Sequence, residues 1–413
     1  MEFIVPLSSP AAADAERFGP KAANLAKLAH AGLPTPGGFC IDAAAYRRQL
    51  ESFGLDLHDA TRRGVLAIKL AFFDRPIVDA LREPLLDAWR RHSAHTPAGM
   101  AVRSSALVED RFGASFAGQF ESYLGLQSED EYETAVRSCW AALWSTRVLR
   151  YMATHDASPS ETAMAVLVQP LVNADASGGA LSTTANDDRV INATRGLGSA
   201  IAQGEVIPER IVLSRDGTLR EKSSGGSYQR LGCSHIAARG KSLFQASQCL
   251  DAAQARSLGA LVERVEDLMG MAVEIEWALD QEGFKLLQAR PLHLQAEPVR
   301  DHLWRKHPGL NGQPAGVGWG EGRAVVVNCE CELERVAAGD VLVTRSAGPA
   351  LSAVLPRVAG VVAELGGSTS HLASLARERG LPMVLGVRDA TSCIPDGAQV
   401  AVDGVTGVVR WMR

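Results

Sequence analysis

Several features that would assign a protein to a specialised class are scarce in this chain of 413 residues. Its seven cysteines show no disulfide framework, and only Cys329 and Cys331 lie close together, which is a weak metal signal and favours reduced thiols. No apolar run approaches the ~20 residues of a membrane-spanning helix. The N-terminus lacks the basic start and long apolar core of a signal peptide. We therefore expect a cytoplasmic protein.

An excess of charge of one sign is also missing. The formal net charge is −5 with 22% charged residues, which gives no reason to expect nucleic acid or an anionic membrane as a partner. Internal repeats and low-complexity tracts are absent as well. A length of 413 residues with 46% hydrophobic composition suits two or three domains with their own cores.

A polar segment punctuated by proline and glycine divides the chain. Residues 1–295 show alternating helical and short strand patterns, and we expect one domain there. Residues 296–313 are typical of an interdomain linker. Residues 314–413 contain recurring β-rich segments, which predict a small α/β domain with strands near 323–327, 340–344, 360–363 and 399–402.

The most informative stretch is GGSTSHLASLARERGLP, residues 366–382. A glycine turn and hydroxyl residues precede His371, an apolar pattern with helical spacing follows it, and Gly380 and Pro382 end the predicted helix. His371 then lies in the first helical turn, where free N–H groups and the helix dipole favour an anion. An imidazole held there is well placed to carry a phosphoryl group. A lone histidine at a helix start is, however, more often an ordinary surface residue.

Two basic residues of the first predicted domain are candidates for phosphate contacts. Lys21 follows a Gly-Pro turn at a helix start, and Arg103 ends an apolar, strand-like run from which it can clamp phosphate oxygens. A loop of small residues that includes Ser115, Gly118 and Gln119 would let the backbone approach phosphates closely. An ordinary tight turn fits the spacing of that loop equally well.

Two alternating segments predict a β-hairpin near residue 281. If residues 281–283 form a three-residue loop with its glycine in the left-handed conformation, Glu276 faces Gln288 and Glu274 faces Arg290. Facing side chains have Cβ atoms only about 4.5–5.5 Å apart. Glu276 and Gln288 could then grip a hard cation, whereas a two-residue loop would break this register. A surface ladder of charges is the alternative interpretation.

The stretch around His371 closely resembles the phosphohistidine motif of the PEP-utilising mobile domain of PEP synthase, pyruvate phosphate dikinase and rifampin phosphotransferase. Residues 382–387 and 396–407 continue the family pattern, and residues 101–122 and 273–290 resemble the dikinase ATP-grasp domain. The resemblance covers nearly the whole chain. It implies an α/β and α+β architecture, with a dikinase-type ATP-grasp nucleotide-binding domain at 1–295, a linker at 296–313 and a swivelling phosphohistidine domain at 314–413.

The resemblance also implies roles for individual residues. His371 would carry the phosphoryl group, and Lys21, Arg103 and Arg290 would act with it on the phosphates. Gln169 and Leu171 would contact adenine, and Ser199 replaces the acid that is usual in the family pattern. Magnesium (Mg2+) would be held by Glu276 and Gln288. The implied ATP contacts are Lys21, Arg103, Ser115, Gly118, Gln119, Gln169, Leu171, Glu276, Gln288 and Arg290.

The family chemistry implies an ATP-dependent dikinase-type phosphotransferase, which moves the ATP β-phosphoryl group to His371 and then to a small-molecule acceptor while AMP leaves. The chain lacks the C-terminal barrel that binds PEP or pyruvate in the dikinases, so the acceptor is expected in a domain crevice or on a separate protein. One alternative is an ATP-grasp ligase or condensing enzyme that activates a carboxylate or hydroxyl group and releases ADP. Another is a non-catalytic phosphocarrier subunit, which Ser199 favours.

Overall fold

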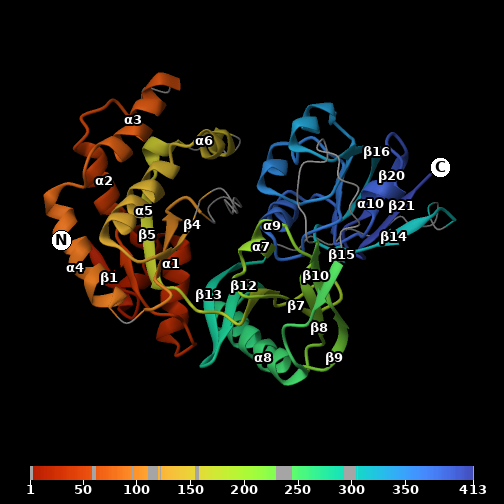
Figure 1. The fold of residues 1–413 in the computed structure, drawn as a ribbon, viewed down its shortest axis with the longest axis horizontal. Helices are drawn as coiled ribbons and strands as arrows, with labels where there is room; N and C mark the ends of the chain where they lie inside the picture. The colour runs from red at the N-terminus through yellow and green to blue at the C-terminus, as the bar shows by residue number, and fades with distance from the viewer. Residues whose placement is uncertain are drawn as a thin grey trace. The chain divides into compact units, whose positions relative to one another are not determined.

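A computed structural model describes residues 3–412 apart from 58–61, 95, 110–119, 121, 154–157, 229–243, 293–303 and 305. By its contacts the chain forms two compact units, Met1–Asn173 with Asp280–Arg290, and Ala174–Leu279 with Pro291–Arg413 (Figure 1). The contacts thus group the later part of the first predicted domain with the C-terminal region. Among the described residues, no helix has the length and apolar character needed to cross a lipid bilayer.

The first unit contains a five-stranded sheet in the order β1-β2-β5-β3-β4, against which α1, α2, α4 and α5 pack. The strands of this sheet are β1 (Ile4–Pro6), β2 (Phe39–Ile41), β3 (Met100–Ala106), β4 (Ser122–Leu126) and β5 (Met164–Pro170). The later segment of this unit contains most of β13 (Gly283–Pro291), which is not a strand of this sheet. The helices of this unit are α1 (Ala15–His30), α2 (Ala43–Glu51), α3 (Arg62–Asp74), α4 (Asp79–Ser93), α5 (Glu129–Ala142) and α6 (Thr146–Ala153), with short 3-10 turns η1 (Pro10–Ala13) and η2 (Pro159–Glu161).

Large aromatic side chains fill the core of this unit. Tyr46 stacks on Phe72 with ring centroids 5.7 Å apart, and Trp140 packs against the same phenylalanine. The indole N–H of Trp144 donates a hydrogen bond of 2.9 Å to the Tyr46 hydroxyl, so the polar ends of two buried rings satisfy each other. This core supports β3 and β5, which carry candidate site residues.

The second unit contains two sheets, of which the first has consecutive strands in the order β12-β6-β7-β8-β9. Helix α8 packs against β7 and β8 (Figure 1). The elements are β6 (Ala176–Leu181), β7 (Arg189–Arg195), α7 (Ser199–Ala202), β8 (Glu209–Leu213), β9 (Leu219–Ser223), α8 (Ala252–Met269) and β12 (Val273–Asp280), with a separate ribbon of β10 (Gly225–Tyr228) and β11 (Phe244–Ser247).

The second sheet of this unit has eight strands in the order β14-β21-β20-β16-β17-β18-β19-β15, with β16 to β19 parallel. The four strands predicted in this region are present. The elements are β14 (Gly309–Asn311), β15 (Gln313–Pro314), β16 (Trp319–Val327), η3 (Glu330–Arg335), β17 (Val341–Thr344), η4 (Pro349–Ala353), β18 (Gly360–Ala363), α9 (His371–Glu378), β19 (Met383–Leu385), α10 (Ala390–Cys393), β20 (Gln399–Asp403) and β21 (Val408–Trp411).

The C-terminal sheet begins inside the segment that was predicted to be a linker. β14 pairs antiparallel with β21, and the Leu310 side chain packs against the hydrophobic core of this sheet. The indole N–H of Trp304 also donates to Glu321 on β16 over 3.2 Å. This segment looks polar in the sequence because its apolar residues are isolated, and of these Leu310 packs against strands that follow later in the chain.

Candidate functional site

Lys21 lies on α1, a helix that packs on β3, just after a kink in that helix. Gly19 has a φ of 73° and is followed by proline, so the helix restarts here. A Cβ on Gly19 would lie 2.5 Å from the carbonyl oxygen of Ser105, and the kink therefore requires glycine. The Lys21 ammonium donates to the Ser104 carbonyl oxygen over 2.7 Å and lies 3.5 Å from a Glu109 carboxylate oxygen. The predicted helix start is confirmed, and Glu109 is a neighbour that the sequence did not connect to it.

Arg103 connects β3 to β13. Its guanidinium donates to the Leu287 carbonyl oxygen over 2.9 Å and to Oε1 of Gln288 over 3.0 Å. Lys21, which reaches the neighbouring residue of β3, belongs to the same cluster. Cations such as Arg103 and Lys21, held on adjacent residues of one strand, can neutralise the oxyanions of a phosphate group. The structure thus joins Arg103 directly to Gln288, and Lys21 contacts the residue next to Arg103 in the strand.

The strand that contains Arg103 extends beyond the apolar run from which it was predicted. β3 continues to Ala106, because Ser104 and Ser105 are buried and pair with Val166 and Ala165 of β5. Small hydroxyl residues are compatible with a buried central strand when their backbone groups pair with a neighbour.

The residues predicted to contact adenine lie at the end of β5, the central strand of the sheet. Gln169 is buried, and its side-chain amide donates to the Gly37 carbonyl oxygen over 3.4 Å. Leu171 follows the strand, and its N–H donates to the Gly99 carbonyl oxygen over 3.0 Å. Ser115, Gly118 and Gln119 lie outside the described residues.

The turn between β12 and β13 differs from the predicted one. It consists of residues 281 and 282, and Gly283 is already the first residue of β13. Gly283 does have a positive φ of 119°, and such a glycine at the start of a strand is typical of a bulge that adds one residue to that strand. The three-residue loop from which the pairing of Glu276 with Gln288 was derived is therefore not the turn observed, and that pairing stays a prediction.

The chemistry of the predicted magnesium ligands can be judged from their donor atoms. Glu276 supplies a carboxylate, and Gln288 supplies an amide oxygen that already accepts from Arg103. Hard oxygens of this kind are the ligands that Mg²⁺ prefers, and phosphate oxygens complete its coordination in nucleotide sites. The described residues contain no group of three or more His, Cys, Asp or Glu side chains arranged to hold a metal. The assignment of Glu276 and Gln288 as magnesium ligands stays a prediction.

His371 is the first residue of α9, as predicted. The side chain of Ser370 caps the helix by accepting the N–H of Ala373 over 3.2 Å, and Gly380, with a φ of 65°, follows its C-terminal end. His371 is half-buried and belongs to the turn in which helix N–H groups lack helical partners. This position suits a group that carries an anion.

The loop before His371 rests on β6 and β7. Asn192 of β7 is fully buried, and its side chain lies 2.9 Å from the hydroxyl of Ser368 and 3.2 Å from that of Thr369. With its amide oxygen directed at the loop, it accepts from the backbone N–H groups of both residues, over 3.1 and 3.2 Å. On β6, a Cβ on Gly179 would lie 2.6 Å from Cβ of Thr369, so the loop needs the space that glycine leaves.

A buried cluster of Glu274, Ser374 and Arg377 lies beside this loop. Glu274 of β12 accepts from the Arg377 guanidinium over 2.8 Å and from the Ser374 hydroxyl over 3.0 Å. Arg377 also donates to the carbonyl oxygens of Ser368 over 2.6 Å and Ala315 over 3.2 Å. The sequence analysis set Glu274 opposite Arg290 and missed this ion pair. The available signal was a polar stripe at positions 370, 374 and 377 of the predicted helix.

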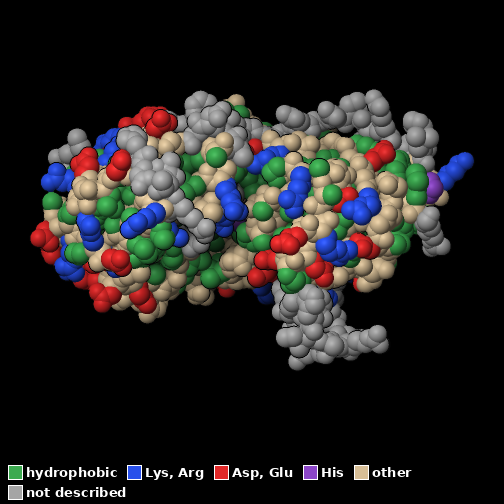
Figure 2. Space-filling view, turned by 90° about the horizontal axis from the view of Figure 1, so that it is seen from above, with side chains coloured by type: hydrophobic (Ala, Val, Ile, Leu, Met, Phe, Trp, Pro, Cys, Tyr) green, Lys and Arg blue, Asp and Glu red, His purple; other side chains and the backbone are tan. Residues whose placement is uncertain are grey.

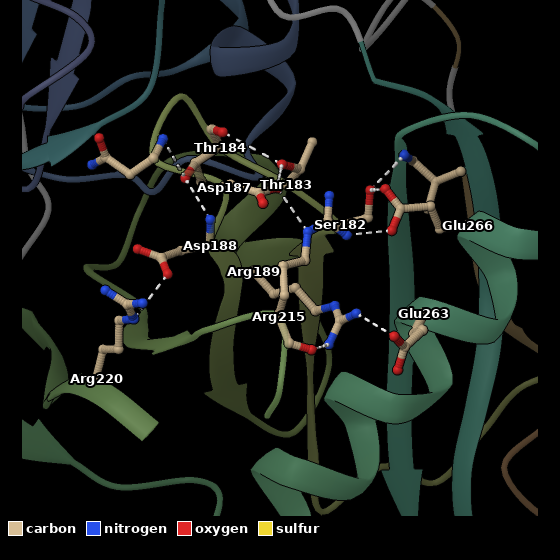
Figure 3. A network of polar contacts seen from close by, with 12 residues as sticks. Ser182, Thr183, Thr184, Asp187, Asp188, Arg189, Arg215, Arg220, Glu263 and Glu266 are labelled. Carbon is tan, nitrogen blue, oxygen red and sulfur yellow. Dashed lines mark hydrogen bonds and ion pairs between the residues drawn. The ribbon is translucent and has the colours of Figure 1, made fainter. Parts of the chain in front are cut away.

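A second set of charged and hydroxyl side chains surrounds the start of β7, and we call it the exposed network after its exposed members Asp187 and Arg215, although Ser182 and Arg189 within it are buried (Figure 3). Arg215 donates to Asp187 over 2.8 Å and also to Glu266. The hydrogen bond from Arg215 holds the pKa of the Asp187 carboxyl below its ordinary value. Basic and acidic side chains are interspersed on the face in view in Figure 2. The exposed network consists of Ser182, Thr183, Thr184, Asp187, Asp188, Arg189, Arg215, Arg220, Glu263 and Glu266.

Two family models match the chain. Residues 15–306 match the AMP/ATP-binding domain of pyruvate phosphate dikinase, and residues 336–407 match the mobile domain of PEP-utilising enzymes. The residues described above fall into both matches. Lys21, Arg103 and Gln288 belong to the first, and His371 belongs to the second.

Curated relatives match almost the whole chain. A probable phosphoenolpyruvate synthase of Pyrococcus abyssi is 30% identical over 96% of this chain and 57% of its own length. A phosphoenolpyruvate synthase of Aeropyrum pernix is 31% identical over 95% of this chain and 56% of its own length, and that of Pseudomonas aeruginosa is 30% identical over 99% and 58%. The chain thus spans a little more than half the length of these relatives. It belongs to the pyruvate phosphate dikinase and PEP synthase family, with a mixed α/β, ATP-grasp-like AMP/ATP-binding domain and a PEP-utilising mobile domain.

Proposed function

We propose that this chain is an ATP-dependent phosphotransferase in which His371 takes the β-phosphoryl group of ATP and passes it to a small-molecule acceptor, with release of AMP. The observation that carries the proposal is the environment of His371. The histidine begins a capped helix, and the glycine loop before it is held by buried side chains of the sheet that contains β12. That strand also carries Glu276, one of the proposed magnesium ligands.

The proposed roles in the first unit follow from charge and position. Lys21, Arg103 and Arg290 would neutralise the phosphate oxygens as negative charge shifts during transfer. Gln169 and Leu171, at the end of a buried central strand, would contact adenine. The small-residue loop with Ser115, Gly118 and Gln119 would approach the phosphates through its backbone. Glu276 and Gln288 would hold Mg²⁺, which when bound offsets the charge of the phosphate oxygens.

The proposed reaction is balanced in three steps. A ring nitrogen of His371 forms a bond to the β-phosphorus, the bond from that phosphorus to the AMP oxygen breaks, and AMP leaves with the electron pair. The γ-phosphoryl group is then removed by water or orthophosphate, which yields orthophosphate or pyrophosphate and leaves phospho-His371. Transfer from phospho-His371 to the acceptor regenerates the free histidine.

The segment between Leu292 and Trp304 is long enough for His371 to move between a charging site and a discharging site. Leu292 is fixed by a hydrogen bond to Ala272, and Trp304 is fixed to Glu321. The dozen or so residues between them reach about 40 Å when fully extended. The acceptor site would lie in a crevice of this chain or on a separate protein. A cytoplasmic location also remains a prediction, based on cysteine usage.

Labelled ATP tests this proposal. With [β-³²P]ATP and a divalent metal, we expect an acid-labile, alkali-stable label on the wild-type protein and none on His371→Ala. The matched control is His307→Ala, which removes another histidine of the same compact unit and should keep the label. Release of AMP, measured by chromatography, separates this reaction from that of a ligase, which releases ADP. Absence of the β-label under every metal condition would contradict the proposal.

A further inference from the structure

We propose that Gly179, Asn192 and Glu274 form a docking face that holds the His371 loop in position while the histidine is charged. They lie on the neighbouring strands β6, β7 and β12 of one sheet, and each meets the segment between residues 368 and 377. The inference rests on the proposed function and deepens it, because it names positioning residues that act through the loop and not on the nucleotide.

Gly179 supplies the space for docking. A methyl group there would lie 2.6 Å from Cβ and 2.9 Å from Oγ1 of Thr369, and the Cβ is attached directly to the backbone, so it cannot swing aside. Gly179 pairs with Glu276 of β12 and Asn192 of β7 in a regular antiparallel ladder, and its φ is not positive. Alanine is therefore compatible with the strand itself. The substitution Gly179→Ala should oppose docking without opposing folding.

The charge pair provides the attraction. The side chains of Glu274 and Arg377 are only 6% and 4% exposed when the loop is docked. If the loop leaves the sheet, both groups regain water, so neither is trapped without a partner. If Glu274 is neutralised, Arg377 remains charged and buried in the docked state and can recover hydration by undocking. Removal of the carboxylate charge should therefore shift the population toward the undocked form.

Asn192 fixes the position of the loop above the sheet. It is fully buried and meets both Ser368 and Thr369, the residues that lie three and two positions before His371. The backbone adds contacts at the edge of this face, where the N–H of Gly366 donates to the Val206 carbonyl oxygen over 2.9 Å. The loop is thus held at Gly366 and again at Ser368 and Thr369, and α9 begins two residues after the second of these contacts. This arrangement determines where the imidazole lies.

The main test compares Gly179→Ala with the matched control Gly348→Ala in the full chain. A Cβ on Gly348 would meet nothing nearer than 3.9 Å, so the control adds the same methyl group without a steric conflict. We expect initial labelling of His371 by [β-³²P]ATP to fall about tenfold or more in Gly179→Ala, because the overlap cannot be relieved within a packed contact. The affinity for AMP-PNP, measured by calorimetry, should stay within about a factor of two of wild type, since the residue acts on the loop. Labelling in the control should equal wild type.

A second variant tests the charge pair. Glu274→Gln should lower the labelling rate without changing AMP-PNP affinity, and Glu274→Asp, which keeps the charge, should restore part of the rate. Glu266→Gln is the matched control, because it removes a carboxylate that also binds one arginine and one serine in the same unit. That control should label like wild type.

Hydrogen exchange separates this inference from the proposed function, because it requires no ATP. The peptide that contains residues 366–378 should exchange faster in Gly179→Ala and Glu274→Gln than in both controls, while urea unfolding remains cooperative. If exchange and labelling match wild type in both variants, the docking face is wrong and the proposed function stands. If AMP-PNP affinity falls with labelling, the residues belong to the nucleotide site and the inference is overturned. If wild type takes no label but exchange changes as expected, only the proposed function fails.

Discussion

Two groups of charged side chains in the second unit use the same residue types but differ in burial and in what they join. In the buried cluster, the side chains of Glu274 and Arg377 are 6% and 4% exposed, and they come from positions 103 residues apart. In the exposed network, Arg215 is 37% exposed and bonds to Asp187, which is 71% exposed and only 28 positions away (Figure 3). The first links a helix to a distant strand, and the second fastens local turns and a helix around one strand.

This difference teaches what each group can do. Exposed ion pairs gain little, because water already solvates both charges and salt screens them. A buried pair depends strongly on both partners, because removal of one leaves the other charged without solvent. The buried cluster is therefore sensitive to whether α9 is docked, whereas the exposed network is suited to steady, modest support of the sheet.

The largest effect is expected for Arg377→Met, which removes the Arg377 guanidinium from Glu274 and a donor from the carbonyl oxygens of Ser368 and Ala315. The unfolding free energy should fall by about 3 kcal/mol, because the folded state loses the buried ion pair and either keeps Glu274 buried without Arg377 or gives up the docked packing of α9. Urea unfolding followed by circular dichroism measures this loss. Arg220→Met, in the exposed network, is the control and should stay within about 0.5 kcal/mol of wild type. A loss of less than about 1 kcal/mol for Arg377→Met would remove the contrast between the two groups.

A smaller effect is expected for Arg215→Ala. It breaks the bonds to Asp187 and Glu266, and the unfolding free energy should fall by about 1 kcal/mol at low salt, less than for the buried cluster. Most of this difference from wild type should disappear in 1 M sodium chloride, at a screening length of about 3 Å. Parallel urea titrations at both salt concentrations measure it. A salt-independent loss would show that Arg215 acts by packing and not by charge.

The smallest effect is expected for Asp187→Asn, and it should appear as a change in how the unfolding free energy depends on pH. The pKa of Asp187 is lowered in the folded state by the hydrogen bond from Arg215, relative to an ordinary value of 3.8. Its contribution to stability is fully present above pH 3.8 and is lost as the pH falls through the lower folded-state pKa. The stability difference between wild type and Asp187→Asn should therefore shrink below about pH 4. Asparagine tolerates the φ of 58° at this position, so the variant changes charge without adding strain. A difference that is constant from pH 7 to pH 3 would contradict this assignment.

Local features of the candidate site could be predicted well. The helix that begins at His371 and the helix start near Lys21 were both predicted, because caps, glycines and prolines act on the residues next to them. The β strands around β17 and β18 were also recognised, since continuous apolar runs bounded by turns indicate buried parallel strands.

Other features could not be predicted, because their causes are distant in the sequence. The end of the supposed linker forms β14 only because β21, near the C-terminus, pairs with it. The continuation of β3 through Ser104 and Ser105 depends on β5, which comes some sixty residues later. Arg103 meets Gln288 across 185 positions. No local propensity contains such information, because it arises from which surfaces fold against each other.

By itself, the sequence determined the chemical inventory of this protein: a histidine at a helix start, two basic residues at defined turns and strands, and a carboxylate and an amide on two successive strand-like segments. These are encoded by neighbouring residues, whose steric and hydrogen-bonding preferences act over one or two turns. Only the tertiary structure decided that Glu274 pairs with Arg377 and that Gly179 leaves room for Thr369. Burial is the physical reason. Where water is excluded, an unpaired charge or a steric overlap is costly, so only matching partners can pack together.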